Sequence, residues 1–282
     1  NPDVKTFDDF GQYVKYAQDR GLEFYYILNS PLAFSEKVWN KQKGNLYDLL
    51  DKLHDIGCKN IKLANFQLID IIKNYKHDFD ISLSTCFEYR SLSQYRNLVD
   101  ALGAIKSINI ATDYNRDFVF LKNLRRILPE AKIEILVNEG CLYACPARYS
   151  HHQTHFHRWD CEAYGETQGA LEYFCRENFV FPQDLGYFSA IGINNFKLIS
   201  VQPRDNFNDL SFNINYMDSV ENGVENLTVS QFLNIFDKFE IKIKRDAKLT
   251  DIIEYLPSMK HFSKYGNKCA SICGVECNYC SQ

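Results

Sequence analysis

The chain has 282 residues, 45% of them hydrophobic, and a formal net charge of −4. This length and apolar content fit one large α/β domain, or a domain with a small appendage. The apolar core is large enough to be stable without disulfide bonds. No apolar run approaches the roughly 20 residues of a membrane-spanning helix, and no long basic run suggests non-specific nucleic-acid binding. Recognition of a specific RNA substrate is compatible with this charge distribution. The lack of a secretory pattern predicts a cytoplasmic protein, and the first residue is not Met, so we expect a trimmed or processed N-terminus.

Helical and strand patterns alternate along the first two thirds of the chain. Helices are predicted at 7–20, 45–56, 68–75, 92–102, 118–128 and 184–191, and strands at 24–28, 61–63, 81–83, 108–111, 133–137 and 196–200. This alternation with short connections predicts βαβ units around a parallel sheet. After residue 204 the chain is Asn-rich and less regular, with helices expected at 230–239 and 249–255. We therefore expect a barrel-like domain over 1–205 and a C-terminal extension over 206–282.

Several predicted strands end in a polar residue, namely Asn29, Asn65, Thr85, Asp113 and Asn138. In a parallel barrel such positions gather at the carboxyl-terminal rim, where active sites are built. The same residue types also start helices as N-caps. The two interpretations are compatible.

Residues with metal-binding or catalytic side chains are most concentrated in the segment 137–161, VNEGCLYACPARYSHHQTHFHRWDC. It follows a predicted strand and holds three cysteines and four of the seven histidines. Thiolates and imidazoles bind iron–sulfur clusters, zinc or copper. Four cysteines lie within 35 residues: Cys141, Cys145, Cys161 and Cys175. They predict an iron–sulfur cluster, with zinc (His151 or His155 replacing a cysteine), disulfides and unligated thiols as alternatives.

The histidines and Arg148 of this segment are the candidates for chemistry beyond ligation. His151 and His155 share a face if the segment is helical, and either imidazole could shuttle a proton. Both are also explained as exposed polar residues. Arg148 could hold a carboxylate or phosphate in a bidentate fork, or pair with Glu139 or Asp160.

A second cysteine group closes the chain: Cys269, Cys273, Cys277 and Cys280. Four thiols in twelve residues predict another metal site, either an auxiliary cluster or zinc. The last three have the spacing of the radical S-adenosylmethionine motif. That motif normally lies early in a barrel, whereas two residues follow it here, so we reject this interpretation. Cys58 and Cys86 are isolated and are predicted to be core residues or neighbours of a metal ligand.

The order of these features resembles peptidase family U32, the collagenase-like peptidases that include oxygen-independent hydroxylases of RNA and of ubiquinone precursors. The resemblance covers about 7–205 and rests on the strand-to-Cys loop, on Pro182-Gln183-Asp184-Leu185 and on Phe196-Lys197-Leu198. It implies a TIM-like (β/α) barrel lacking its first strands, since strand 24–28 resembles the third strand of the family.

The resemblance also implies a 4Fe-4S cluster near the carboxyl-terminal rim of the barrel. Its first three ligand positions would be Cys141, Cys145 and Cys161. The fourth family ligand falls where this chain has Gly186, and Cys175 is our substitute.

We therefore expect an iron–sulfur enzyme that performs redox or oxygen-independent hydroxylation chemistry on an organic substrate or RNA. Its expected catalytic residues are Asn138, Glu139, Arg148, His151 and His155. The alternatives are a metal-dependent peptidase or hydrolase, and a non-catalytic, metal-stabilised subunit of a homo- or heterodimer. No membrane partner is expected.

Overall fold

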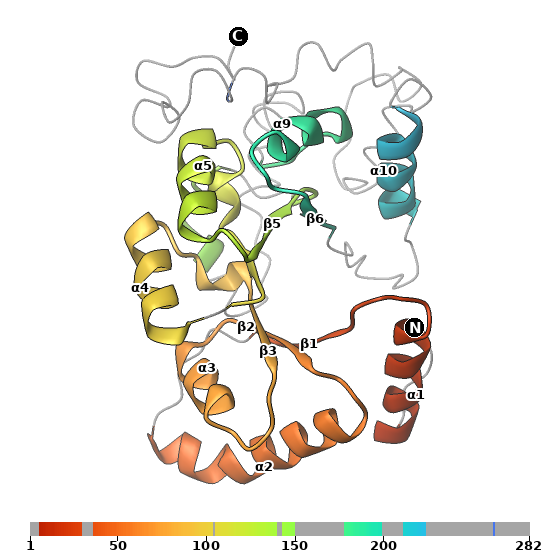
Figure 1. The fold of residues 1–282 in the computed structure, drawn as a ribbon, viewed down its shortest axis with the longest axis vertical. Coiled ribbons are helices and arrows are strands. Elements are labelled where there is room, and N and C mark those ends of the chain that lie inside the picture. Colours follow the sequence, from red (N-terminus) through yellow and green to blue (C-terminus); the bar gives the residue numbers. More distant parts are fainter. Residues whose placement is uncertain are drawn as a thin grey trace. The chain divides into compact units, whose positions relative to one another are not determined.

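The structure is a computed structural model that describes residues 6–29, 36–103, 105–139, 143–149, 178–198, 211–223 and 262. The chain forms two compact units. The first is built mainly from residues 1–109 with 130–132, and the second from 110–129, 133–148 and the residues after 156. Figure 1 shows the elements of both.

The first unit is a parallel sheet with helices. Its strands are β1 (Tyr25–Leu28), β2 (Asn60–Leu63), β3 (Asp80–Leu83) and β4 (Ser107–Asn109), and its helices are α1 (Phe7–Gln18), α2 (Glu36–Asp55), α3 (Phe66–Lys73) and α4 (Leu92–Leu102). A short 3-10 helix, η1 (Thr85–Phe87), follows β3. Successive strands pair in parallel with aligned register, as in Tyr25–Asn60–Asp80.

The second unit contains β5 (Lys132–Leu136), whose first residue groups with the first unit, and β6 (Asn195–Lys197), which pair in parallel. The helical elements are η2 (Thr112–Tyr114), α5 (Phe118–Ile127), η3 (Pro182–Asp184), α9 (Leu185–Ser189) and α10 (Ser211–Asn222). Apolar side chains of α5 and α9 meet in the core of this unit, where the Phe118 and Phe188 rings lie 5.1 Å apart.

The strand order in the sheet is the chain order, β1 to β6, and each strand pair that the structure describes is parallel. This sequential α/β order is that of part of a TIM-like (β/α) barrel. The predicted fold class is confirmed. Over the described residues no helix is long and apolar enough to cross a membrane.

Local signals explain why the predicted and observed elements agree so closely. Helix α4 has the predicted bounds because Ser91 and Gln94 form a capping box at its start, and Gly103, at φ +69°, ends it. Asn65 caps α3 by accepting a hydrogen bond from the Gln67 amide, so α3 begins at Phe66 rather than at the predicted residue 68.

Two helices differ from the predictions. Helix α2 begins at Glu36, nine residues before the predicted start. The prediction missed its first two turns because Val38 and Trp39 are their only apolar residues, too few to give a helical periodicity. Helix α10 was not predicted, since its segment is Asn-rich and weakly amphipathic. The predicted helices at 230–239 and 249–255 and the predicted domain boundary at 205–206 lie outside the described residues.

Candidate functional site

The loop that follows β5 is anchored by one carboxylate from the preceding strand–helix connection. Asp113, in η2, accepts hydrogen bonds at Oδ1 from the Ala144 backbone N–H (2.8 Å) and from Asn178 Nδ2 (3.3 Å). Arg148 Nη1 lies 2.6 Å from the same oxygen. Ala144 adopts φ +53°, a left-handed conformation that costs a non-glycine residue roughly 1–2 kcal/mol. Asp113 therefore fixes both ends of the turn that carries Cys145.

Arg148 is the largest fully buried side chain of the described residues. Asp113, which is 13% exposed, is one partner of Arg148. The sequence suggested Glu139 or Asp160, and Asp160 lies outside the described residues. A guanidinium without solvent contact is stabilised only by a close counter-charge and hydrogen bonds. Arg148 therefore acts first as a structural cation that holds the loop, and its backbone N–H also donates to the Cys145 carbonyl at 3.3 Å.

Buried amides join this loop to the neighbouring segments. Asn115 Nδ2 donates to the backbone carbonyls of Leu136 and Asn178, each at 2.9 Å. The predicted catalytic residue Asn138 is 1% exposed and donates from Nδ2 to Oδ1 of Asn213 at 3.2 Å. Asn138 thus connects the end of β5 to α10.

Helix α10 is held in place by a buried tyrosine as well. The Tyr216 hydroxyl donates to the Val180 carbonyl at 2.8 Å. Burial raises the pKa of Tyr216 well above its usual range, and the nearby charge of Asp184 raises it further. The phenol therefore stays protonated and acts as a hydrogen-bond donor.

Of the predicted metal ligands, the described part of the chain contains Cys145 alone. Cys145 is a free, partly exposed thiol. The other predicted cluster and zinc ligands and the two histidines lie outside the described residues: Cys141, Cys161, Cys175, Cys269, Cys273, Cys277, Cys280, His151 and His155. Within the described part of the chain, no group of three or more His, Cys, Asp or Glu residues could hold a metal ion. Glu139, the remaining predicted catalytic residue, is 6% exposed.

A second polar cluster lies at the carboxyl end of β3 in the first unit. Cys86 is a buried free thiol that accepts a hydrogen bond from Asn29 Nδ2 at 3.8 Å. Glu88 has φ +50° and a buried carboxylate, and Arg90 Nη2 lies 3.2 Å from it. Non-glycine residues in this backbone region are concentrated at functional sites. Cys58 and Cys86 are both buried core residues, as predicted.

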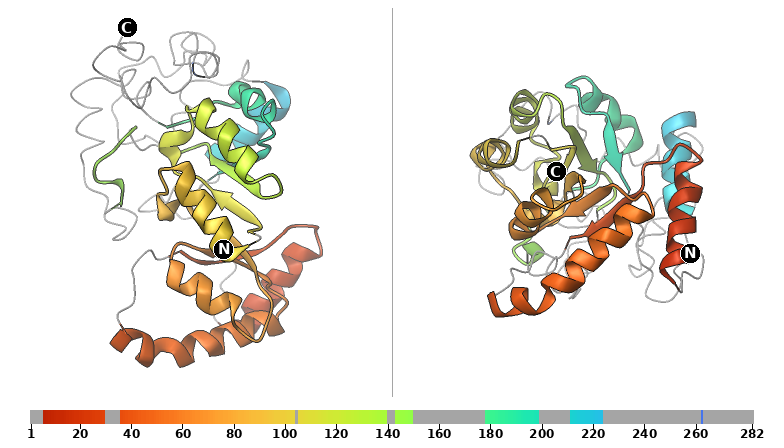
Figure 2. Two further views of the ribbon diagram at one scale, coloured as in Figure 1. Left: turned by 60° about the vertical axis from the view of Figure 1, so that its left-hand side comes forward. Right: turned by 60° about the horizontal axis from the view of Figure 1, so that its bottom comes forward.

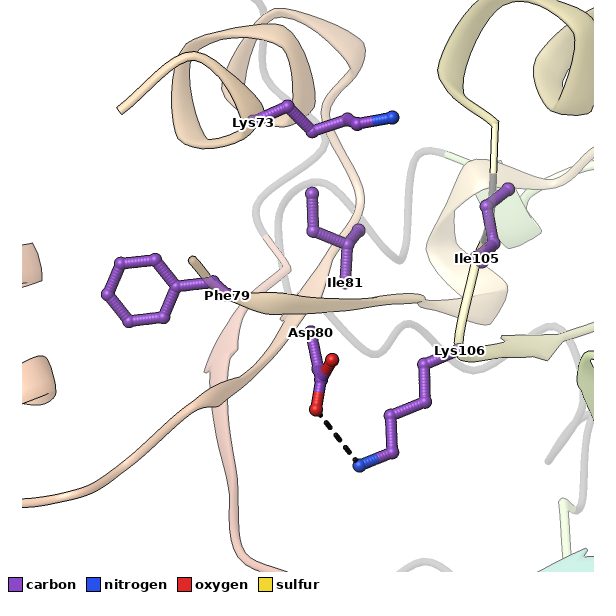
Figure 3. Close-up of a pocket in the computed structure, with 6 residues that line it drawn as sticks. All are labelled: Lys73, Phe79, Asp80, Ile81, Ile105 and Lys106. Carbon is purple, nitrogen blue, oxygen red and sulfur yellow. Dashed lines mark hydrogen bonds and ion pairs between the residues drawn. The ribbon is translucent and has the colours of Figure 1, made fainter. Parts of the chain in front are cut away.

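The amino ends of the strands of the first unit carry an exposed charge network. Lys106 Nζ lies 2.6 Å from Asn60 Oδ1, 3.3 Å from Asp80 Oδ2 and 3.6 Å from Glu23 Oε2, while Lys132 Nζ lies 3.3 Å from Glu23. Figure 3 shows Asp80 and Lys106 beside an open pocket of about 390 Å³. In barrel enzymes this end of the strands serves stability, and the opposite end serves catalysis.

Sequence reasoning placed Asp113 and Asn138 correctly as polar residues at strand ends, but it did not identify Asn115, Asn178 or Glu88. Asn115 lies two residues beyond Asp113, and this proximity is a signal that could have drawn attention to it. Nothing local marks Asn178 as a partner of Asp113, because 65 residues separate them.

Comparison with known proteins gives one consistent answer. The model of peptidase family U32 matches residues 4–158, more than half of the chain. A protein of Methanocaldococcus jannaschii named as an uncharacterized protease is 21% identical over 299 residues, covering 98% of this chain and 80% of its own length. A solved structure, the U32 peptidase Mk0906, has 16% identity and a TM-score of 0.48, covering 70% of this chain and 77% of that chain. The chain belongs to peptidase family U32.

Proposed function

We propose that this U32 family member is an iron–sulfur enzyme, in which Cys145 binds a 4Fe-4S cluster together with Cys141, Cys161 and Cys175. The supporting observation is the anchored turn that carries Cys145. Its thiol is free and partly exposed, and its backbone is fixed on both sides through Asp113. A ligand to a rigid cluster needs such a fixed position, and its thiol must not be consumed by a disulfide.

A bound cluster with four thiolates supplies one-electron chemistry, and one with three offers an open iron site to a substrate. The roles of the chain's own residues follow from their contacts. Arg148 and Asn138 are positioning residues, because the contact of Arg148 with Asp113 holds the loop and that of Asn138 with Asn213 holds α10. We propose Glu139, His151 and His155 as the proton-handling groups. The reaction class is redox or oxygen-independent hydroxylation of an organic substrate or RNA.

We propose a second, separate metal site at Cys269, Cys273, Cys277 and Cys280, holding either an auxiliary iron–sulfur cluster or zinc. The two sites predict different metal contents. If both hold clusters, the protein contains about eight irons per chain, and if only the first does, about four.

The test is anaerobic purification of the full chain with iron and zinc assays and a visible absorption spectrum. We expect a brown protein whose iron content falls by about four atoms per chain in Cys145→Ala. Cys58→Ala is the matched control, because Cys58 lies in the core of the first unit and should leave the iron content unchanged. Cys273→Ala should remove only the metal of the terminal site.

A colourless protein that contains zinc, or a Cys145→Ala variant that keeps its full iron content, would overturn the iron–sulfur assignment. Peptide hydrolysis by such a metal-bound, iron-free protein would favour the alternative function, a metal-dependent peptidase, which the names of the family and of the archaeal relative suggest.

A further inference from the structure

A pocket of the first unit lies at the amino ends of β3 and β4, where helices α3 and α4 end. Its volume of about 390 Å³ is within the range of small-molecule sites, roughly 300–1,000 Å³. In an α/β unit each helix runs back along the strands, so the carboxyl ends of α3 and α4 reach this end of the sheet. Figure 2 shows both helices alongside the strands. The residues that line the pocket are Lys73, Phe79, Asp80, Ile81, Ile105 and Lys106.

The buried lining residues of this pocket are both apolar. Ile81, in β3, is 7% exposed, and Ile105, two residues before β4, is 8% exposed. The Phe79 ring adds apolar surface that is partly exposed. In the view of Figure 3, the Lys73 side chain lies above Ile81, and Asp80 points to the opposite side of the strand. Apolar walls with a few charged groups fit a ligand that has an apolar part and a polar end.

The charged lining residues carry one more positive charge than negative. Lys106 Nζ pairs with Asp80 Oδ2 at 3.3 Å. The other acid of this network, Glu23, is shared between Lys106 and Lys132. Among the residues that the structure describes, none forms an ion pair or a hydrogen bond with the Lys73 ammonium. Lys73 therefore provides the surplus positive charge of the pocket.

The position of the Lys73 ammonium is set by the end of a second helix. Lys73 is the last residue of α3, and its Nζ lies 3.9 Å from the point that a Cβ atom on Gly103, the C-cap of α4, would occupy. The carbonyl groups at a helix C-terminus attract a cation, which explains why the side chain extends from α3 to α4. Such an end provides partial charges that water screens, and no carboxylate, so the ammonium can still bind an anion.

We infer that this pocket binds a small organic acid, whose carboxylate or phosphate group pairs with the Lys73 ammonium and whose apolar part lies against Ile81, Ile105 and Phe79. A hydrogen bond between an ammonium and an anionic oxygen is about twice as strong as a neutral one. A neutral or cationic ligand would leave the surplus charge uncompensated.

The location of the pocket determines the role of such a ligand. In barrel enzymes the chemistry is at the carboxyl ends of the strands, whereas this pocket is at the amino ends. The organic acid is therefore an effector or a stabilising ligand and not the substrate. The inference does not depend on the proposed function, because the pocket lies in the first unit and none of the proposed metal ligands lines it.

The test is thermal unfolding of the full-length protein with benzoate, phenyl phosphate, acetate or the neutral benzamide, at constant ionic strength. A ligand of the folded state raises the unfolding temperature in a saturable way. We expect saturation with benzoate or phenyl phosphate at an apparent Kd on the order of 1 mM, and at least about tenfold weaker effects of acetate and benzamide. Saturation with benzoate alone assigns a carboxylate, with phenyl phosphate alone a phosphate, and with both an anionic group of either kind.

Variants of the lysine locate the effect in the pocket. Lys73→Met should weaken the apparent affinity for the stabilising anion at least about fivefold, and Lys73→Arg should retain most of it. Lys15→Met is the matched control, because Lys15 is also an exposed lysine in the last turn of a helix, α1 of the same unit. It should bind the anion as the wild type does. Far-UV circular dichroism of each variant shows that it is folded.

If Lys73→Met fails to fold, the comparison of the four compounds on the wild type still decides the question. The inference would be overturned by a lack of saturation with both aromatic acids, by equal stabilisation with acetate or benzamide, or by an unchanged affinity in Lys73→Met. Because the iron content is measured on the same samples, a failure here is distinguishable from a failure of the iron–sulfur assignment.

Discussion

Two charge networks of this molecule use similar residue types in opposite environments. In the second unit, Arg148 and Asp113 are 0% and 13% exposed, and their pair fixes the turn of Cys145. In the first unit, Lys106, Asp80 and Glu23 are 25%, 57% and 48% exposed. Exposed pairs contribute little because water solvates each partner, whereas removing one partner of a buried pair leaves an uncompensated charge. The contrast indicates that the burial of an ion pair, and not the number of ion pairs, decides how much a network contributes to the stability of the fold.

The strongest test of this contrast is Asp113→Asn, which preserves the shape of the side chain and removes its charge. We expect the free energy of unfolding to fall by about 3 kcal/mol or more, because the fully buried Arg148 loses the counter-charge of Asp113. Urea denaturation of both proteins measures the difference. The matched control is Asp80→Asn in the exposed network, with an expected loss below about 1 kcal/mol. Equal losses in the two variants would contradict the comparison.

A second prediction concerns the neutral hydrogen bonds around the same turn. Asn115→Ala removes a donor from two buried backbone carbonyls, those of Leu136 and Asn178. We expect a loss of about 2 kcal/mol, since each carbonyl would be left unsatisfied away from water. Asn222→Ala is the control, because the Asn222 amide donates to Asp218 at the surface. If both substitutions cost the same, burial is not the deciding factor.

The sequence predicted those helices and strands whose ends are determined by residues close to them in the chain. The Ser91–Gln94 capping box and Gly103 define α4, and alternating strands and helices indicate a parallel sheet. Contacts between residues far apart in the chain have no comparable local pattern in the sequence. The pair of Asp113 and Arg148 spans 35 residues, so sequence reasoning marked both residues without connecting them.

The missed start of α2 and the missed helix α10 have a related cause. Glu36 begins a helix whose first turns are polar, and α10 keeps Tyr216 and Ser219 buried among polar neighbours such as Asn213. Packing accompanies α10, whereas the first turns of α2 are mostly exposed, and in both cases the apolar periodicity that guides prediction is weak or absent.

A third prediction addresses how α10 is held beside the turn. Tyr216→Phe keeps the buried ring and removes the hydroxyl that donates to the Val180 carbonyl at 2.8 Å. We expect a loss of about 1 kcal/mol, the net value of one neutral hydrogen bond, smaller than that of Asp113→Asn. Urea denaturation measures it. Tyr16→Phe, at an exposed residue of α1, is the control with no expected change. A loss as large as that of Asp113→Asn would mean that charge adds nothing to the buried network.

The smallest expected effect is in the exposed network and depends on pH. A hydrogen bond from the Tyr25 hydroxyl, with smaller contributions from Lys132 and Lys106, lowers the pKa of the Glu23 carboxyl below its usual value of 4.5, against a smaller desolvation effect in the opposite direction. A carboxylate whose pKa is lower in the folded state stabilises the fold above its unfolded pKa, and this contribution disappears as the pH falls through the folded pKa.

The substitution Glu23→Gln should therefore lower the free energy of unfolding by less than about 1 kcal/mol at pH 7, and high salt should reduce that loss further. Urea denaturation from pH 7 to pH 3 should show the two proteins converging on the acidic side. A cost that persists at pH 3, or that exceeds the cost of Asp113→Asn at pH 7, would reverse the ranking of the two networks.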